Sequence, residues 1–288
     1  MPSLGNLTGL EHERTEYPDP PLWQACRVSA VEPFPPASPP HTRARLRVEL
    51  VLVLAITVGQ SALYAVLSLV RRLLDPLPLS EQTAKLNTPF DAAAAWDILY
   101  RLLDVLFDLA LVGLVLYLLW EPGRSALRRL GLDFSRFGGD ALRGLALVAA
   151  IGVPGLALYA AGRALGVTVA VEASPAGLDW WTVPLLVLSA LRAGLIEEVI
   201  VIGYLGDRLS RLGWGSWRII VAAALLRGAY HAYQGFGAIV GNIAMGLVFG
   251  WCYRRWGRLM PLVVAHTVID MIAFVGYPLA AAAFPDLF

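Results

Sequence analysis

The chain alternates between long apolar stretches and short segments rich in arginine, a pattern that predicts membrane-spanning helices. Several apolar runs approach the roughly 20 residues that cross a bilayer as an α-helix. Seven spans are predicted, at residues 48–70, 98–120, 144–165, 182–205, 218–233, 237–253 and 259–281. The fifth and sixth are short, so counts from six to eight are compatible with the pattern. The expected fold class is all-α, a polytopic transmembrane helical bundle.

Composition supports a membrane protein. Of the 288 residues, 57% are hydrophobic and 16% are charged, whereas about a quarter of the residues are charged in soluble domains. The mean hydropathy is +0.62. The formal net charge is +1, and without a basic domain the chain offers no reason to expect a nucleic-acid partner. The partner that composition predicts is the lipid bilayer.

The chain divides into three predicted regions. Residues 1–42 hold nearly half of the 19 prolines and show no hydrophobic periodicity, which predicts a disordered cytoplasmic tail. Residues 43–165 form N-terminal transmembrane helices with a basic loop at 121–143. This loop either lies in the membrane interface as an amphipathic segment or is solvated. Residues 182–281 form a C-terminal helical core.

Arginines flanking the spans predict the orientation, because Lys and Arg are retained on the cytoplasmic side. If seven spans alternate, the arginine clusters before the first span and after the second, fourth and sixth fall on one side. Arg71 and Arg72, after the first span, depart from this rule. We expect an integral protein of the bacterial cytoplasmic membrane with a cytoplasmic N-terminus.

Ionisable residues inside the spans are the strongest functional signal. Each costs on the order of 2.5 to 3.5 kcal/mol on insertion scales, so each is a functional hypothesis until a partner explains it. Glu197 and Glu198 are adjacent in an otherwise apolar span, His231 lies near the end of the fifth span, and His266 lies in the seventh. Asp270 follows His266 by four residues, which places both on one helical face.

These residue types suit the hydrolysis of a peptide bond in a dry site. A carboxylate can take a proton from water, and carboxylates with imidazoles can hold a metal that lowers the pKa of bound water to about 7. Adjacent helical residues point about 100° apart, so Glu197 and Glu198 cannot serve one atom equally, and we expect one to support the other. In the structural alternative, the histidines hydrogen-bond between helices and the carboxylates neutralise Arg192 or Arg227.

The glutamate pair, His231, and His266 with Asp270 resemble the three motifs of the CPBP intramembrane proteases. This group contains the CAAX prenyl endopeptidases of the Rce type and Abi-like proteins, and the resemblance covers roughly residues 182–274. It implies a membrane-embedded helical endopeptidase that cleaves a membrane-associated protein or peptide, with residues 182–281 as its catalytic core. It also implies that Glu197 and His231 activate a water while Glu198 assists.

The resemblance leaves the metal open, since both a metalloprotease and a metal-free glutamate mechanism have been argued for the family. His266 and Asp270 would stabilise the oxyanion or help to hold a metal. If a metal is present, two histidines with carboxylates suit zinc, with Glu197, His231 and His266 as the expected ligands.

Two positions depart from the family motifs. Ile202 stands where the first motif carries an arginine, and Arg227 stands where the second carries a phenylalanine. We expect Arg227 to reach the carboxylate pair from the neighbouring helix and to replace the missing charge. The predicted topology puts Glu197 and His266 at similar depth and His231 deeper, unless the fifth span starts late, is tilted, or breaks around Gly228.

Two other functions remain open at this stage. A catalytically inactive protein of the same fold would act as a scaffold that binds a partner. A proton-coupled transporter would use Glu197, Glu198, Asp104 and Asp108 as a relay. The last two share a helical face with Asp97 and Arg101, where either pairing of Arg101 with Asp97 and Asp104 or a water-filled path is expected.

Overall fold

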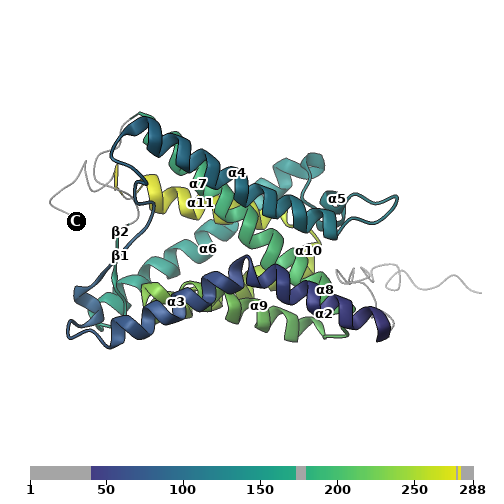
Figure 1. The fold of residues 1–288 in the computed structure, drawn as a ribbon, viewed down its shortest axis with the longest axis horizontal. Helices are drawn as coiled ribbons and strands as arrows, with labels where there is room; N and C mark the ends of the chain where they lie inside the picture. Colours follow the sequence, from purple (N-terminus) through teal and green to yellow (C-terminus); the bar gives the residue numbers. More distant parts are fainter. Residues whose placement is uncertain (1–39, 173–179, 277, 280–288) are drawn as a thin grey trace, which may run out of the picture. The chain divides into compact units, whose positions relative to one another are not determined.

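The computed structural model describes residues 40–172, 180–276 and 278–279, and most of them are helical (Figure 1). The helices are α2 (Pro40–Ala55), α3 (Val58–Leu73), α4 (Ala94–Leu118), α5 (Ala126–Leu130), α6 (Phe137–Ala164), α7 (Thr182–Glu197), α8 (Leu205–Arg211), α9 (Ser216–Tyr230), α10 (Phe236–Trp256) and α11 (Met260–Met271). Short 3-10 segments lie at η1 (Leu79–Glu81), η2 (Phe134–Arg136) and η4 (Ala232–Gln234), and π-helical segments at η3 (Glu198–Tyr204) and η5 (Ile272–Gly276). The all-α prediction is confirmed. The predicted tail, apart from its last three residues, which begin α2, lies outside the described residues.

One small sheet was not predicted. Strands β1 (Thr83–Lys85) and β2 (Ala170–Glu172) pair in parallel, with Ala84 opposite Val171. They join the connection after α3 to the connection after α6. Arg72 is used in this region, because its guanidinium donates to Gln82 Oε1 at 3.2 Å and to the Thr83 carbonyl at 3.1 Å. This arginine, an exception to the orientation rule, is therefore bound by a connecting loop.

The predicted seven spans are not confirmed. Among the described helices, two are long and apolar enough to cross a membrane, α10 and the helical stretch Phe134–Ala164 that includes α6. The pair α2 and α3 would make a third. Large apolar side chains such as Leu67, Phe107 and Leu156 are exposed, as a lipid-facing surface requires. An integral membrane protein is therefore supported.

The first predicted span is broken. Helices α2 and α3 meet at a 52° bend, where a single helix was expected at residues 48–70. Gly59 makes the bend possible, because a Cβ at this position would lie 2.5 Å from the Leu54 carbonyl oxygen. The Thr57 hydroxyl stabilises the bend by donating to the Val53 carbonyl at 2.6 Å. No proline lies at this break, which is why the sequence pattern did not reveal it.

Glycines bring the helices of the C-terminal core close together. A Cβ on Gly228 of α9 would lie 2.6 Å from Ile243 Cγ1 of α10, and one on Gly246 would lie 2.7 Å from Ala224 Cα. A Cβ on Gly194 of α7 would meet the Thr267 hydroxyl of α11 at 2.7 Å. Small residues at helix contacts let backbones approach closely in membranes. These contacts position α7, α9 and α11, which carry the candidate site.

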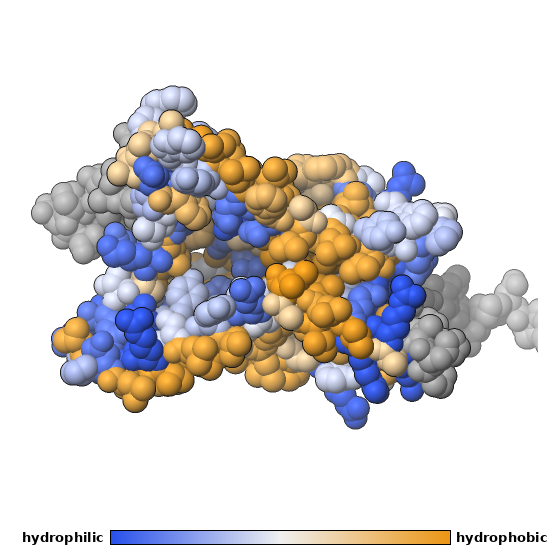
Figure 2. All heavy atoms as spheres, viewed as in Figure 1, coloured by the Kyte–Doolittle hydropathy of each residue, from blue (hydrophilic) through white to orange (hydrophobic). Residues whose placement is uncertain are grey.

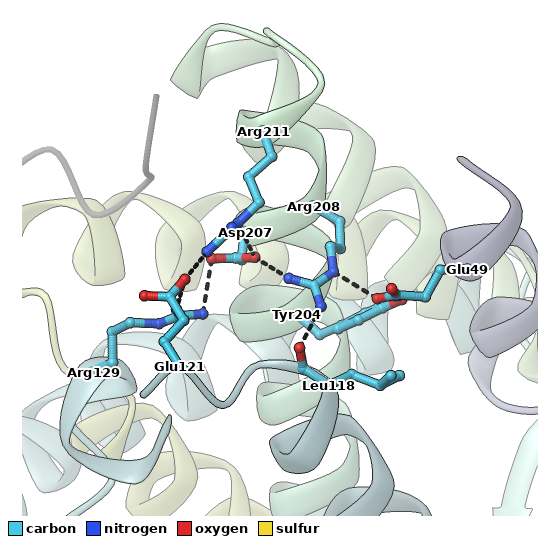
Figure 3. Close-up of polar contacts among 8 residues, drawn as sticks. All are labelled: Glu49, Leu118, Glu121, Arg129, Tyr204, Asp207, Arg208 and Arg211. Carbon is cyan, nitrogen blue, oxygen red and sulfur yellow. Dashed lines mark hydrogen bonds and ion pairs between the residues drawn. The ribbon is translucent and has the colours of Figure 1, made fainter. Parts of the chain in front are cut away.

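An ion-pair cluster joins α2, α5, α8 and the connection from α4 to α5 (Figure 3). Asp207 Oδ1 accepts from Arg129 at 3.0 Å, and its Oδ2 accepts from Arg208 at 2.5 Å and from Arg211 at 2.9 Å. Arg208 also binds Glu49 at 2.7 Å. Hydrogen bonds from Arg211, then from Arg129, hold the pKa of Glu121 below its usual range. We call this ion-pair cluster the α8 cluster, and its members are Glu49, Glu121, Arg129, Asp207, Arg208 and Arg211.

The basic loop at residues 121–143 is partly anchored by tertiary contacts. Arg258 binds Asp140 at 2.7 Å and Asp133 at 3.1 Å. The Ser135 hydroxyl and Arg258 lower the pKa of Asp133 to about 2. Phe134 and Phe137 are exposed, with ring centroids 5.7 Å apart. The two exposed rings favour placement of this loop in the membrane interface, which stays a prediction.

Candidate active site

A cavity of about 520 Å³ lies between the bend of α2 and α3, helix α4, helix α7 and the end of α9. Figure 2 shows a hollow between the segments labelled α3 and α4 in Figure 1, with hydrophilic side chains inside it. The polar and charged side chains in its wall include Gln60, Ser61, Asp108, Arg192, Glu197 and Tyr230. Polar groups within apolar helices thus gather around one predicted catalytic carboxylate.

The two adjacent glutamates have different environments. Glu197 ends α7, lines the cavity and keeps 16% of its side chain exposed. Glu198 begins the π-helical segment η3 and is fully buried. As expected from the 100° offset of adjacent helical residues, the two carboxylates point to different places. One lines the cavity and the other is buried behind it. π-Helical turns inside α-helices frequently occur at functional sites.

Arg227 makes the predicted contact with the carboxylate pair. Its guanidinium lies 2.5 Å from Glu198 Oε1 and 3.5 Å from Glu197 Oε2. The side chain is fully buried, and its guanidinium carbon lies 5.4 Å from the Phe249 ring centroid. Ile202, which replaces the arginine of the first motif, is 4% exposed and packs in the apolar core. Arg227 thus reaches the carboxylate pair from α9, and its replacement of the motif arginine stays a prediction.

His266 connects the two glutamates with the third motif. Its Nδ1 lies 2.8 Å from Glu198 Oε1, and its Nε2 lies 3.9 Å from Glu197 Oε2 and 3.6 Å from Asp270 Oδ2. Carboxylates therefore face both ring nitrogens. The i, i+4 relation of His266 and Asp270 on α11 places them together, as expected from the spacing.

His231 directly follows Tyr230, the last residue of α9, and the two rings pack with centroids 4.8 Å apart. Its Nδ1 lies 3.1 Å from the Arg227 carbonyl, which can only accept, so Nδ1 carries a proton. In the neutral imidazole Nε2 is then a proton acceptor. Helix α9 runs unbroken past Gly228, and Tyr230 at its end reaches Glu197, so the ends of α9 and α7 lie close together. The depth of His231 in the membrane stays a prediction.

Sequence reasoning missed Tyr230 and the pairing of Arg192. The Tyr230 hydroxyl donates to Glu197 Oε2 at 2.6 Å. Arg192 of α7 pairs with Asp104 and, at 3.1 Å, with Asp108 of α4. Arg101 binds Asp97 at 2.8 Å, as expected, whereas Asp104 turns to Arg192. The position of Tyr230 beside a motif histidine was the available signal for its contact with Glu197. Periodicity within α4 could not show the pairing of Arg192, because it does not reveal which helix faces α4.

The donor set does not form a metal centre in the part of the chain that the structure describes. No group of three or more His, Cys, Asp or Glu side chains there is arranged to hold a metal ion. The zinc site at Glu197, His231 and His266 therefore stays a prediction that this geometry does not support.

Comparison with known proteins identifies the segment that carries the site. Residues 179–272 match the family model of the type II CAAX prenyl endopeptidase Rce1-like proteins. This segment belongs to the CAAX protease family. The predicted resemblance is thus confirmed for the CAAX protease segment, which contains all six candidate site residues. No curated protein and no solved structure matches the chain. The bend after α2, helix α3 and helix α4, which complete the cavity wall, precede the matched segment.

Proposed function

We propose that this protein is an intramembrane endopeptidase that cleaves a membrane-associated protein or peptide. The observation that carries the proposal is Glu197, a carboxylate that lines a cavity and is backed by a buried network of Arg227, Glu198 and His266. The family of residues 179–272 supports the same reaction class. Neither alternative function is favoured by a specific contact.

Glu197 and His231 act on water in this proposal. Glu197 takes a proton from a water molecule, assisted by His231 Nε2, and the resulting hydroxide bonds to the carbonyl carbon of the scissile peptide bond. The bond from that carbon to nitrogen then breaks as the proton passes to the leaving amine. General acid–base steps of this kind contribute typically 10²–10⁴-fold.

Charge stabilisation in this proposal comes from His266, Glu198 and Arg227. His266, oriented by Asp270 at 3.6 Å, donates to the oxygen that becomes negative in the tetrahedral intermediate. Arg227 neutralises Glu198, which in turn holds the other nitrogen of His266. A desolvated carboxylate without such a partner would be costly inside the bundle.

The cavity provides the place for the substrate. Its volume of about 520 Å³ falls within the range of about 300–1,000 Å³ typical of ligand sites. An extended peptide has backbone groups that need hydrogen-bond partners inside a membrane. Gln60, Ser61 and the Arg192 ion pair supply such partners next to Glu197.

Three of the four carboxylates that the transporter alternative would use as a relay are held in close contacts. Asp104 and Asp108 pair with Arg192, and Glu198 pairs with Arg227 and His266. A proton relay needs carboxylates that can exchange their protons, whereas these carboxylates are held by fixed cations. The scaffold alternative is an outcome of the following test.

The test is peptidase turnover by detergent-purified protein against a panel of membrane-anchored peptides, beside Glu197→Gln. The amide cannot take a proton, so we expect turnover to fall by about 100-fold or more. Glu172→Gln is the matched control, because the Glu172 side chain in β2 is 43% exposed and pairs with exposed Lys85, and it should retain full turnover. Metal content is measured on the same samples. A correctly folded wild type that cleaves no peptide of the panel would favour the scaffold.

A further inference from the structure

Tyr230 is a residue of the cavity wall that the family motifs do not account for, and it contacts the proposed catalytic base. It ends α9, is 7% exposed and lines the cavity together with Glu197. Its hydroxyl donates to Glu197 Oε2 at 2.6 Å, shorter than either cation contact of this carboxylate. A buried tyrosine hydroxyl normally has such a partner, but here the partner is the proposed catalytic base.

The donors around Glu197 all approach the same oxygen. Tyr230 lies at 2.6 Å, Arg227 at 3.5 Å and His266 at 3.9 Å from Oε2. Within the described part of the chain, none of these three contacts involves Glu197 Oε1. The carboxylate is therefore held at one oxygen, while the other is left available to the cavity.

We propose that Tyr230 is a positioning residue that holds Glu197 by Oε2 so that Oε1 receives the proton of the attacking water. This inference rests on the proposed endopeptidase function. A neutral hydroxyl suits the task, because it orients the carboxylate without adding the full charge of a second guanidinium at 2.6 Å. Catalytic groups lose large factors in rate when they are misplaced by about 1 Å.

Helix packing determines the position of the Tyr230 hydroxyl. Gly228 lies two residues before Tyr230 and lets α9 approach α10, where a Cβ would meet Ile243 at 2.6 Å. The Tyr230 ring also packs against the His231 ring, with centroids 4.8 Å apart. The tyrosine is therefore held by the same turn that carries Arg227 and His231.

The experiment compares Tyr230→Phe with Tyr204→Phe in kinetics and infrared spectroscopy. Tyr204 is a matched control, because it is fully buried and its hydroxyl donates to Glu49 of the α8 cluster at 3.0 Å (Figure 3). Neither Tyr204 nor Glu49 lines the cavity. Both variants lose one tyrosine–glutamate hydrogen bond and keep the ring. We expect Tyr230→Phe to lower kcat by about 10- to 100-fold with KM within about twofold, and Tyr204→Phe to leave both unchanged.

The infrared readout is independent of turnover. The carboxylate band of Glu197, identified as the band lost in Glu197→Gln, should shift in Tyr230→Phe and stay in place in Tyr204→Phe. An unchanged kcat in Tyr230→Phe beside an active wild type would overturn the inference and leave the endopeptidase proposal standing. An inactive wild type would overturn the proposed function and the positioning role with it, and an unshifted band would show that the hydroxyl does not hold the carboxylate.

Discussion

At the scale of residues, Arg227 sets the electrostatics of the site. It is fully buried and meets two carboxylates of the preceding helical segments, Glu198 at 2.5 Å and Glu197 at 3.5 Å. A buried ion pair adds little net stability, but removal of one partner leaves an uncompensated charge. The main role of Arg227 is therefore to neutralise the buried Glu198 carboxylate, and its contribution to helix packing is secondary.

Arg227→Met should destabilise the protein by roughly 3–5 kcal/mol, because Glu198 would remain buried without its cation. The measurement is the free energy of unfolding in detergent, with turnover recorded on the folded fraction. Arg227→Met combined with Glu198→Gln is the control, since it removes both charges, and it should recover most of the lost stability. If the single variant were as stable as the wild type, Glu198 would not depend on Arg227.

At the scale of elements, the approach of α9 to α10 decides where the second motif lies. Gly228 and Gly246 face the partner helix without a Cβ, and α9 packs more extensively against α10 than against any other helix. The carboxyl end of α9 carries Arg227, Tyr230 and His231 toward α7 and η3. A small displacement of α9 would therefore alter three site residues together.

Gly228→Ala should lower the stability by about 1–3 kcal/mol, because the new Cβ would overpack against Ile243. Turnover should also fall, since the helix end that carries Tyr230 is displaced. Gly113→Ala is the control: Gly113 lies within α4 with open space around its Cβ position, so alanine there should be neutral or stabilising by up to about 1 kcal/mol. Equal thermal denaturation curves for both variants would contradict the packing role.

At the scale of the whole molecule, the α8 cluster links segments from distant parts of the chain. Asp207 accepts from Arg129, Arg208 and Arg211, and Glu49 of α2 binds Arg208 (Figure 3). Helix α8, which carries Asp207, follows η3, so the cluster ties the segment after Glu198 to α2, to α5 and to the connection between α4 and α5. It is separate from the cavity, whose wall contains none of its members.

Asp207→Asn should destabilise the protein by roughly 3 kcal/mol, because three arginines lose their shared carboxylate while two of them stay largely desolvated. Denaturation followed by tryptophan fluorescence provides the measurement. Turnover of the folded fraction should remain near the wild-type value, since the cluster does not contact Glu197. A variant with normal stability but lost turnover would reverse this assignment.

The sequence predicted the helical class and the candidate residues, but parts of the arrangement were beyond it. The motif spacing correctly pointed to Glu197, Glu198, His266 and Asp270 as neighbours, and the motif departures pointed to Arg227. The bend between α2 and α3 escaped because a glycine, not a proline, permits it. The catalytic roles of these residues and the zinc site remain predictions.

What the sequence by itself determined is local: apolar runs that form helices, charged residues placed within them, and the family of residues 179–272. Only the tertiary structure decided which charges meet. Arg227 and Glu198 are 29 positions apart, Tyr230 and Glu197 33, and Arg192 and Asp104 88. Such contacts depend on how closely and at what angle helices pack, and helical periodicity shows which face a residue lies on but not which helix faces it.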